Sequence, residues 1–133
     1  DAARKRLTDE ERALRAITER TLQLFTSRML TSVGFRAGHH YDSRFSDPGT
    51  KGMPDLIVLG HGQYFQIELK RWNGVLSPDQ ETWRDQSAEA GIEYLVFRPQ
   101  DWGELVALAQ ARSRRPVSEE FHQLPHPKRR RKV

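Results

Sequence analysis

The sequence has no cysteine among its 133 residues. Disulfide bonds, thiolate metal sites and cysteine nucleophiles are therefore excluded for this stretch of chain. Any chemistry that these residues carry out must use carboxylates, imidazoles, amines or hydroxyls instead.

Long apolar runs are also lacking. No stretch approaches the roughly 20 apolar residues that a membrane-spanning helix needs, so we expect no contact with a membrane. The first residues, Asp1 to Arg6, are charged and lack the apolar core of a signal peptide, which favours an intracellular location.

Hydrophobic residues make up 36% and charged residues 30% of the chain, a balance typical of one globular domain of this length. We expect a basic N-terminal segment (residues 1–8), a globular domain (9–111) and a disordered basic tail (112–133). The tail carries eight Lys and Arg against two Asp and Glu, whereas residues 1–111 carry 14 against 16. The pI of about 9.8 therefore does not by itself indicate a DNA-binding surface.

The spacing of apolar residues predicts both helices and strands. Thr8, followed by three acidic residues, is a helix start, and a helix is expected over about residues 9–33, either continuous or with one break. Further on we expect strands at 35–41, 55–59, 63–70 and 93–98, a loop at 42–54, and helices at 77–90 and 101–111. The three prolines and scattered charges after Ser113 predict disorder.

The strands at 55–59 and 63–70 are joined by a Gly-His-Gly turn, which predicts a β-hairpin. Glu68 and Lys70 alternate with apolar residues in the second strand, so their side chains point to the same face. Asp55 opens the first strand, and its carboxylate can converge with these two groups across the pair.

Two carboxylates and one ammonium group at a single place suit the hydrolysis of a phosphodiester bond. Carboxylate oxygens are natural ligands of Mg²⁺, an ion that also accepts phosphate oxygens. A bound ion can activate water, and a lysine can orient that water and stabilise the negative charge that develops on the phosphate.

Three segments of the sequence, taken in order, are similar to one nuclease family. Met53-Pro54-Asp55 followed by Glu68-Leu69-Lys70 resembles the PD-(D/E)xK nuclease superfamily. The longer segments GMPDLI (52–57), IELKR (67–71) and GVLSPDQ (74–80) look like its VRR-NUC branch in particular. The resemblance covers roughly residues 15–110 and implies an α/β fold with a restriction-endonuclease-like core, in which helices flank a small mixed β-sheet.

In similar proteins the acidic residues of these motifs bind the metal. The ligands of Mg²⁺ that the resemblance implies, with Mn²⁺ able to substitute, are Asp55, Glu68 and the Leu69 carbonyl. Lys70 takes the role of the catalytic lysine. The resemblance also places Glu19 of the first helix at the metal and Gln80 of the later helix near the site. Leucine at position 69, where the family usually has valine, changes only the apolar face.

Each of these residues also has a purely structural interpretation. Glu68 and Lys70 can form a solvated surface ion pair, and Asp55 can cap a loop or strand. Glu19 can be an ordinary exposed helix residue, and Gln80 a polar residue of a first helical turn. The presence of all three core residues in the expected order favours the catalytic interpretation for the set.

A polar loop before the metal-binding strand is expected to contact DNA phosphates, the alternative being a loop without such a role. The side chains expected to make these contacts are Ser43, Arg44, Lys51 and, after the second strand, Arg71. His39 and His40 are adjacent on a strand and face opposite ways, so at most one of them can serve the site.

Three tryptophans can stack on exposed bases. For Trp83 and Trp102 the expected place is the hydrophobic core, which is the commoner environment of an aromatic residue on a helix. Trp72 stays open to either role.

The sequence PKRRRKV at residues 127–133 has three open interpretations. It looks like a short nuclear localisation signal, it can bind nucleic-acid phosphates without sequence preference, or it is an appended tag. The protein is expected in the nucleus if this run acts as an import signal, and in the cytoplasm if the chain comes from a phage or a bacterium.

The family resemblance implies a structure-selective DNA endonuclease. Small stand-alone members resemble homodimeric Holliday-junction resolvases, so branched DNA and a second copy of the chain are the expected partners. A sequence-specific, restriction-like nuclease stays open, and so does a non-catalytic module that binds DNA junctions. A metal enzyme acting on small phosphates is the remaining alternative, and a steep salt dependence of DNA binding would count against it.

Overall fold

The computed structural model describes residues 7–39 and 48–125, and this part of the chain contains both helices and strands. The helices are α1 (Asp9–Ala16), α2 (Glu19–Ser32), α3 (Pro78–Glu89) and α4 (Trp102–Ser113). The strands are β1 (Arg36–His39), β2 (Leu56–Gly60), β3 (Gln63–Leu69) and β4 (Tyr94–Phe97). Short 3-10 turns lie at Pro48–Thr50, Pro99–Asp101 and Glu119–Phe121.

The four strands form one mixed sheet in the order β1-β2-β3-β4. β1, β2 and β3 are antiparallel neighbours, whereas β4 runs parallel to β3. The β2–β3 hairpin turns at His61 and Gly62, whose φ angles of 51° and 73° are those of a tight two-residue turn. A parallel neighbour requires a crossover, and α3 provides it between β3 and β4.

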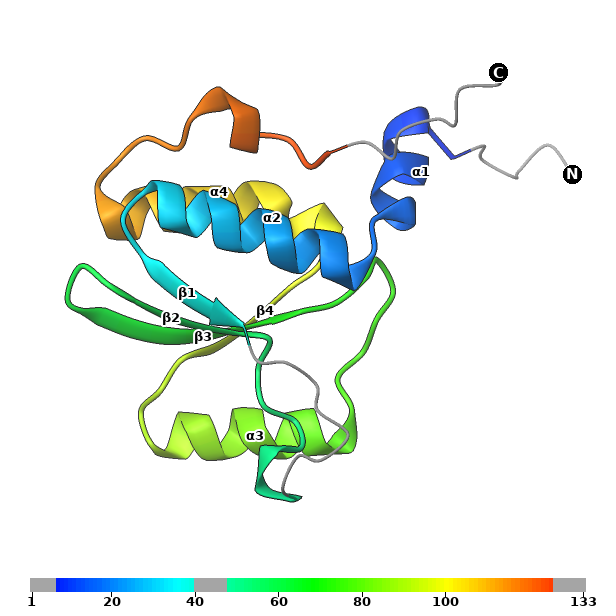
Figure 1. The fold of residues 1–133 in the computed structure, drawn as a ribbon. Coiled ribbons are helices and arrows are strands. Elements are labelled where there is room, and N and C mark those ends of the chain that lie inside the picture. Colours follow the sequence, from blue (N-terminus) through cyan, green and yellow to red (C-terminus); the bar gives the residue numbers. More distant parts are fainter. Residues whose placement is uncertain (1–6, 40–47, 126–133) are drawn as a thin grey trace, which may run out of the picture.

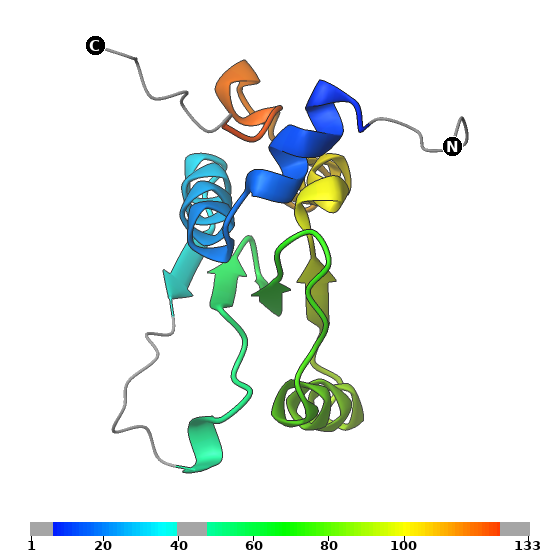
Figure 2. The same cartoon turned by 90° about the vertical axis from the view of Figure 1, so that its right-hand side faces the viewer.

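Helices cover both faces of this sheet, which confirms the α/β class with a small mixed sheet flanked by helices. Figure 1 shows α2 and α4 together on one face and α3 on the other. In Figure 2, α3 lies below the β3 and β4 side of the sheet. The core lies between the sheet and the α2–α4 layer, where alternate residues of β2 and β3 are fully buried: Leu56, Val58, Phe65, Ile67 and Leu69.

Three helices begin at the side of the sheet where the strands β3 and β4 end, which is called here the edge of the site (Figure 1). This arrangement follows from the topology, because α3 returns antiparallel to β3 and α4 returns antiparallel to β4. The amino ends of α2, α3 and α4 therefore face the edge where the loops after β3 and before β2 lie. None of the helices in residues 7–39 and 48–125 is long and apolar enough to cross a bilayer.

The expected first helix contains the one break that the sequence allowed. The chain leaves helical geometry at Ile17 (φ −68°, ψ 123°), and α2 starts anew after Thr18. The Thr18 hydroxyl accepts a hydrogen bond from the Thr21 amide at 3.1 Å, as the Thr8 hydroxyl does from the Glu11 amide at the start of α1. Two threonine caps thus define two helices.

The prediction of disorder from residue 112 onward is wrong for the part that the structure describes. α4 continues to Ser113, and residues 114–125 then run back along the outer side of α2 and α4 (Figure 1). Val117, Phe121 and Leu124 of this segment are buried, and the Trp102 indole donates a hydrogen bond to the Phe121 carbonyl at 2.8 Å. Three apolar side chains are sufficient to anchor the segment, despite its prolines and charges. Residues 126–133 lie outside the described part.

Phe121 has the largest side chain of these three anchors: it is 8% exposed, and its ring lies 5.3 Å from the ring of Phe25. We expect Phe121→Ala to lower the free energy of unfolding by about 3 kcal/mol, the usual cost of removing a buried aromatic ring. Urea unfolding measures this loss. The exposed neighbour Gln123 is the control, since Gln123→Ala should change stability by less than about 0.5 kcal/mol. Equal effects of the two substitutions would contradict the anchoring role.

The two tryptophans that were expected in the core, Trp83 and Trp102, differ in how far they are buried. Trp102 is buried, at 4% exposure, as predicted. The same prediction is wrong for Trp83, which is only half-buried and lies on the α3 layer, away from the main hydrophobic cluster. α3 covers the sheet mainly with polar and small residues, with Ser87 its one buried side chain, so it offers no deep apolar site for an indole.

Candidate functional site

The β2–β3 hairpin brings Asp55 and Glu68 to the same edge of the sheet. Leu56 pairs with Ile67, and Asp55 and Glu68 are the next residues outward on their strands. Asp55 Oδ2 accepts a hydrogen bond from the Leu69 amide at 2.8 Å, which fixes the carboxylate across the two strands. Asp55 is half-buried and Glu68 is 2% exposed. The convergence that the hairpin predicted is therefore present.

The loop that leads into Asp55 passes directly against the first turn of α3. Gly52 has a φ angle of 84°, and a Cβ at this position would overlap the carbonyl of Asp79. Only glycine satisfies both conditions, because other residues disfavour this φ and would also displace α3. Gly52 thereby sets the distance between the Asp55 loop and the amino end of α3.

Glu68 lies on the face of the sheet that α3 covers. Gln66, two residues earlier on β3, points to the same face and accepts a hydrogen bond from the Ser87 hydroxyl of α3 at 3.1 Å. Figure 2 shows α3 against this side of the sheet. The carboxylate is consequently enclosed between two layers instead of facing open solvent.

Burial raises the pKa of Glu68 to about 9, with further increases from its interaction with the Asp55 carboxyl and from the charge of Glu19. The Lys70 ammonium opposes these effects but does not cancel them. Glu68 Oε1 is buried and has no hydrogen-bond partner among the described residues. Folding therefore favours a proton on Glu68, and a bound cation can take the place of that proton between the two carboxyl groups.

Lys70 belongs to this group of charges. Its Nζ lies 4.0 Å from Glu68 Oε2, and the two side chains are 12% and 3% exposed. These exposures contradict the alternative of a solvated surface ion pair. The Lys70 backbone is fixed as well, since its amide donates to the Phe97 carbonyl at 3.0 Å.

Glu19 lies beside this site, but its carboxylate is not grouped closely with those of Asp55 and Glu68. Its Oε1 accepts a long hydrogen bond of 3.4 Å from the Arg71 amide, just after Lys70. Within residues 7–39 and 48–125, no three Asp, Glu or His side chains are grouped so that they could hold a metal ion. Of the predicted metal ligands, the carboxylates of Asp55 and Glu68 therefore lie together, and Glu19 lies next to them.

Gln80 takes part in capping the amino end of α3. Its Oε1 accepts a hydrogen bond from the Ser77 amide at 2.9 Å, while the Ser77 hydroxyl accepts one from the Gln80 amide at 3.2 Å. This reciprocal pair is a capping box. The carboxamide oxygen of Gln80 is therefore engaged in capping, as its structural interpretation states.

The predicted DNA contacts are only partly described. Lys51 and Arg71 are exposed on the loops before β2 and after β3, at the edge of the sheet that carries Asp55 and Glu68.

Trp72 is half-buried, and the guanidinium of Arg15 from α1 lies 5.1 Å from its ring centroid, so this indole packs against α1. His39 is half-buried at the end of β1. Ser43, Arg44 and the neighbouring His40 lie outside the described residues.

Two residues near the site had no role in the sequence interpretation. Arg98, which follows β4, donates through Nε to the Gly74 carbonyl at 2.8 Å and so holds the loop after Lys70. Tyr94 of β4 has a buried hydroxyl without a hydrogen-bond partner among the described residues. No local signal identifies either residue, because their positions depend on the parallel pairing of β4 with β3.

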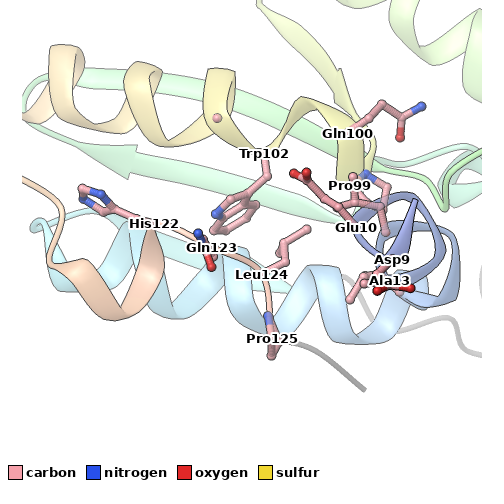
Figure 3. Close-up of a pocket in the computed structure, with 13 residues that line it drawn as sticks. Asp9, Glu10, Ala13, Pro99, Gln100, Trp102, His122, Gln123, Leu124 and Pro125 are labelled. Atoms are coloured by element: carbon pink, nitrogen blue, oxygen red, sulfur yellow. The ribbon is translucent and has the colours of Figure 1, made fainter. Parts of the chain in front are cut away.

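A separate cavity of about 540 Å³ lies between α1, the start of α4 and residues 122–125. Figure 3 shows Asp9 and Glu10 of α1, Trp102 of α4 and Leu124 along its walls. None of the predicted catalytic or metal-binding residues lines this cavity.

Comparison with known proteins gives no match: no family model, no curated protein and no solved structure is significantly similar to this chain. What the site can do must therefore be judged from its residues and their geometry.

Proposed function

We propose that the chain is a Mg²⁺-dependent endonuclease with a PD-(D/E)xK core, and that it hydrolyses phosphodiester bonds in DNA. The observation that carries this proposal is the buried Glu68 carboxylate beside Asp55, with the Lys70 ammonium 4.0 Å away. A buried pair of carboxylates is costly for a protein unless a cation or a proton neutralises it. Such a pair beside the loops at the ends of the strands is typical of a functional site.

The residues present fit a hard divalent cation. Asp55, Glu68 and the Leu69 carbonyl would hold Mg²⁺ or Mn²⁺, because these ions prefer oxygen ligands. Glu68 Oε1 is buried without a protein partner, and the pKa of this carboxyl is raised to about 9, as expected for a group that lacks its counterion. When bound, the ion supplies Lewis-acid activation of water and of the phosphodiester.

Lys70 is the proposed catalytic residue of the chain itself. Its ammonium is held at the border of the carboxylate pair by a backbone that hydrogen-bonds to Phe97. A positive charge at this place can orient the attacking water and stabilise the charge that grows on the phosphate oxygens. Because the side chain is 12% exposed, this stabilisation acts in a partly water-excluded site.

The surroundings of the site suit a polyanion. The amino ends of α2 and α3, which favour negative charge, lie at this edge of the sheet (Figure 1). Lys51 and Arg71 are exposed there and are proposed to contact the DNA backbone. Branched DNA as the substrate, with a homodimer supplying two sites for two strands, is the more specific part of the proposal.

The test is cleavage of labelled four-way junction, flap, single-stranded and linear duplex DNA with Mg²⁺, with Mn²⁺ and with EDTA. We expect cutting that depends on the metal and disappears in Asp55→Asn. Glu93→Gln is the matched control, since it makes the same kind of change in an exposed carboxylate that pairs with Arg112, and it should cut like the wild type. Absence of cutting on every substrate, with junction binding intact, would favour the non-catalytic module instead.

A further inference from the structure

Tyr94 lies in the same layer as the carboxylate pair. In the parallel pairing of β3 with β4, Tyr94 is opposite Gln66, and Val96 is opposite Glu68. Laterally paired residues share a face of the sheet, and Gln66 points towards Ser87 of α3. The Tyr94 side chain therefore lies between the sheet and α3, as Glu68 does.

The polar neighbours of Tyr94 on this face are already paired with other groups. The Gln66 amide donates to the Tyr64 hydroxyl at 3.1 Å, and its carbonyl oxygen accepts from Ser87 at 3.1 Å. The Tyr94 hydroxyl is buried and makes no hydrogen bond to any described residue. A buried hydroxyl without a partner is unfavourable, so its presence here calls for an explanation.

An unmatched acceptor lies on the same face. Among the described residues, Glu68 Oε1 is buried without a donor, while Glu68 Oε2 faces Lys70 and Asp55 Oδ2 accepts from the Leu69 amide. The negative charges of Glu68 and Asp55 both raise the pKa of Tyr94, although burial raises it more. The phenol therefore lies within the electrostatic field of both carboxylates and remains a proton donor.

We propose that Tyr94 is a positioning residue of the carboxylate site: its hydroxyl donates a hydrogen bond through one water molecule to the Glu68 carboxylate and holds it in the orientation that a metal ligand needs. This role rests on the proposed metal-dependent function and adds to it a donor that the sequence motif does not contain. Hydrogen bonds to ligating carboxylates commonly contribute a factor of about 10–100 to metal affinity.

The first test compares Tyr94→Phe with Tyr64→Phe. The two substitutions remove the same atom from the same face, but Tyr64 is 41% exposed and its hydroxyl serves only Gln66 in the described hydrogen bonds. Mn²⁺ binding, followed by calorimetry on the metal-free full chain, should weaken about tenfold in Tyr94→Phe and stay unchanged in Tyr64→Phe. The thermal midpoint of metal-free Tyr94→Phe should change little, because the buried hydroxyl makes no direct hydrogen bond to a described residue.

A spectroscopic measurement separates this role from a merely structural one. The chain has three tyrosines, so labelling them with ¹³C at Cζ gives a simple spectrum. The resonance that Tyr94→Phe removes should shift when Mg²⁺ is added to the wild type, and should not shift in Asp55→Asn.

The possible outcomes are distinct. If the wild type binds no Mn²⁺, the proposed function and the role of Tyr94 both fail. If the wild type binds Mn²⁺ and Asp55→Asn does not, but Tyr94→Phe binds within twofold of the wild type, only the role of Tyr94 is overturned. Tenfold weaker binding with an unchanged thermal midpoint supports both.

Discussion

Lys70→Met is expected to lower the single-turnover rate of metal-dependent DNA cleavage by about a thousandfold. The substitution keeps the length and the apolar stem of the side chain but removes the ammonium that lies 4.0 Å from Glu68. Removing one preorganised electrostatic group from an active site commonly costs a factor of about 10²–10³ in rate. The rate should be measured with enzyme and Mn²⁺ in excess over a labelled four-way junction.

Lys51→Met provides the contrast. Lys51 is exposed on the loop before Asp55, and its proposed contact is with the DNA backbone. Its removal should weaken DNA binding and reduce the salt dependence of the affinity, while the rate at saturating enzyme stays near that of the wild type. A Lys70→Met enzyme that retained the wild-type rate within tenfold would place the catalytic charge elsewhere.

Local signals were sufficient to predict the elements that position the site. Thr8 and Ser77 each carry the side-chain hydroxyl that caps the following helix, and both caps are visible in the sequence. The cap at Thr18, which divides the expected first helix, was not predicted. The short turn between the hairpin strands fixed the pairing of β2 with β3, so the convergence of Asp55 and Glu68 followed from the sequence alone. The PD-(D/E)xK character of the core stays a prediction.

The burial of Glu68 could not be predicted from these signals. Alternation along 63–70 identified one apolar and one polar face, and a polar face is normally solvated. The structure covers that face with α3, because the parallel pairing of β4 requires a crossover helix there. This pairing joins residues far apart in sequence, so neither the enclosed carboxylate nor the nearby Tyr94 had a local signature.

The prediction of disorder for the segment after α4 was wrong for a different reason. Its prolines and charges have the composition of a disordered tail, yet Val117, Phe121 and Leu124 are buried against the helices. Their spacing of four and three residues was a visible signal, although it is too short to predict a helix. Composition describes an average over the segment, whereas anchoring depends on a few side chains and on the surface that receives them.

The stability of the metal-free protein should fall as the pH rises from about 5 to 9. The pKa of Glu68 is raised from 4.5 to about 9 in the folded protein, chiefly by burial and then by Asp55. Folding therefore favours the protonated carboxyl, and this contribution to stability is complete below the pKa of the unfolded chain and disappears as the pH passes the folded pKa. Because each pKa unit corresponds to about 1.4 kcal/mol and the pKa of Glu68 rises by more than four units, the loss should amount to several kcal/mol.

Urea unfolding in EDTA at several pH values measures this dependence, and Glu68→Gln is the control. The neutral amide keeps the shape of the side chain but cannot ionise, so the fall in stability above pH 5 should become shallower. Lys70 and Glu19 also act on Glu68: the Lys70 charge lowers the pKa of Glu68 and the Glu19 charge raises it. Mg²⁺ should restore the stability of the wild type at high pH and leave Glu68→Gln almost unaffected, because binding to the folded state alone stabilises it. A pH dependence that is identical in the two proteins would mean that Glu68 is not the group that titrates, and that the carboxylate pair is neutralised within the protein without a metal.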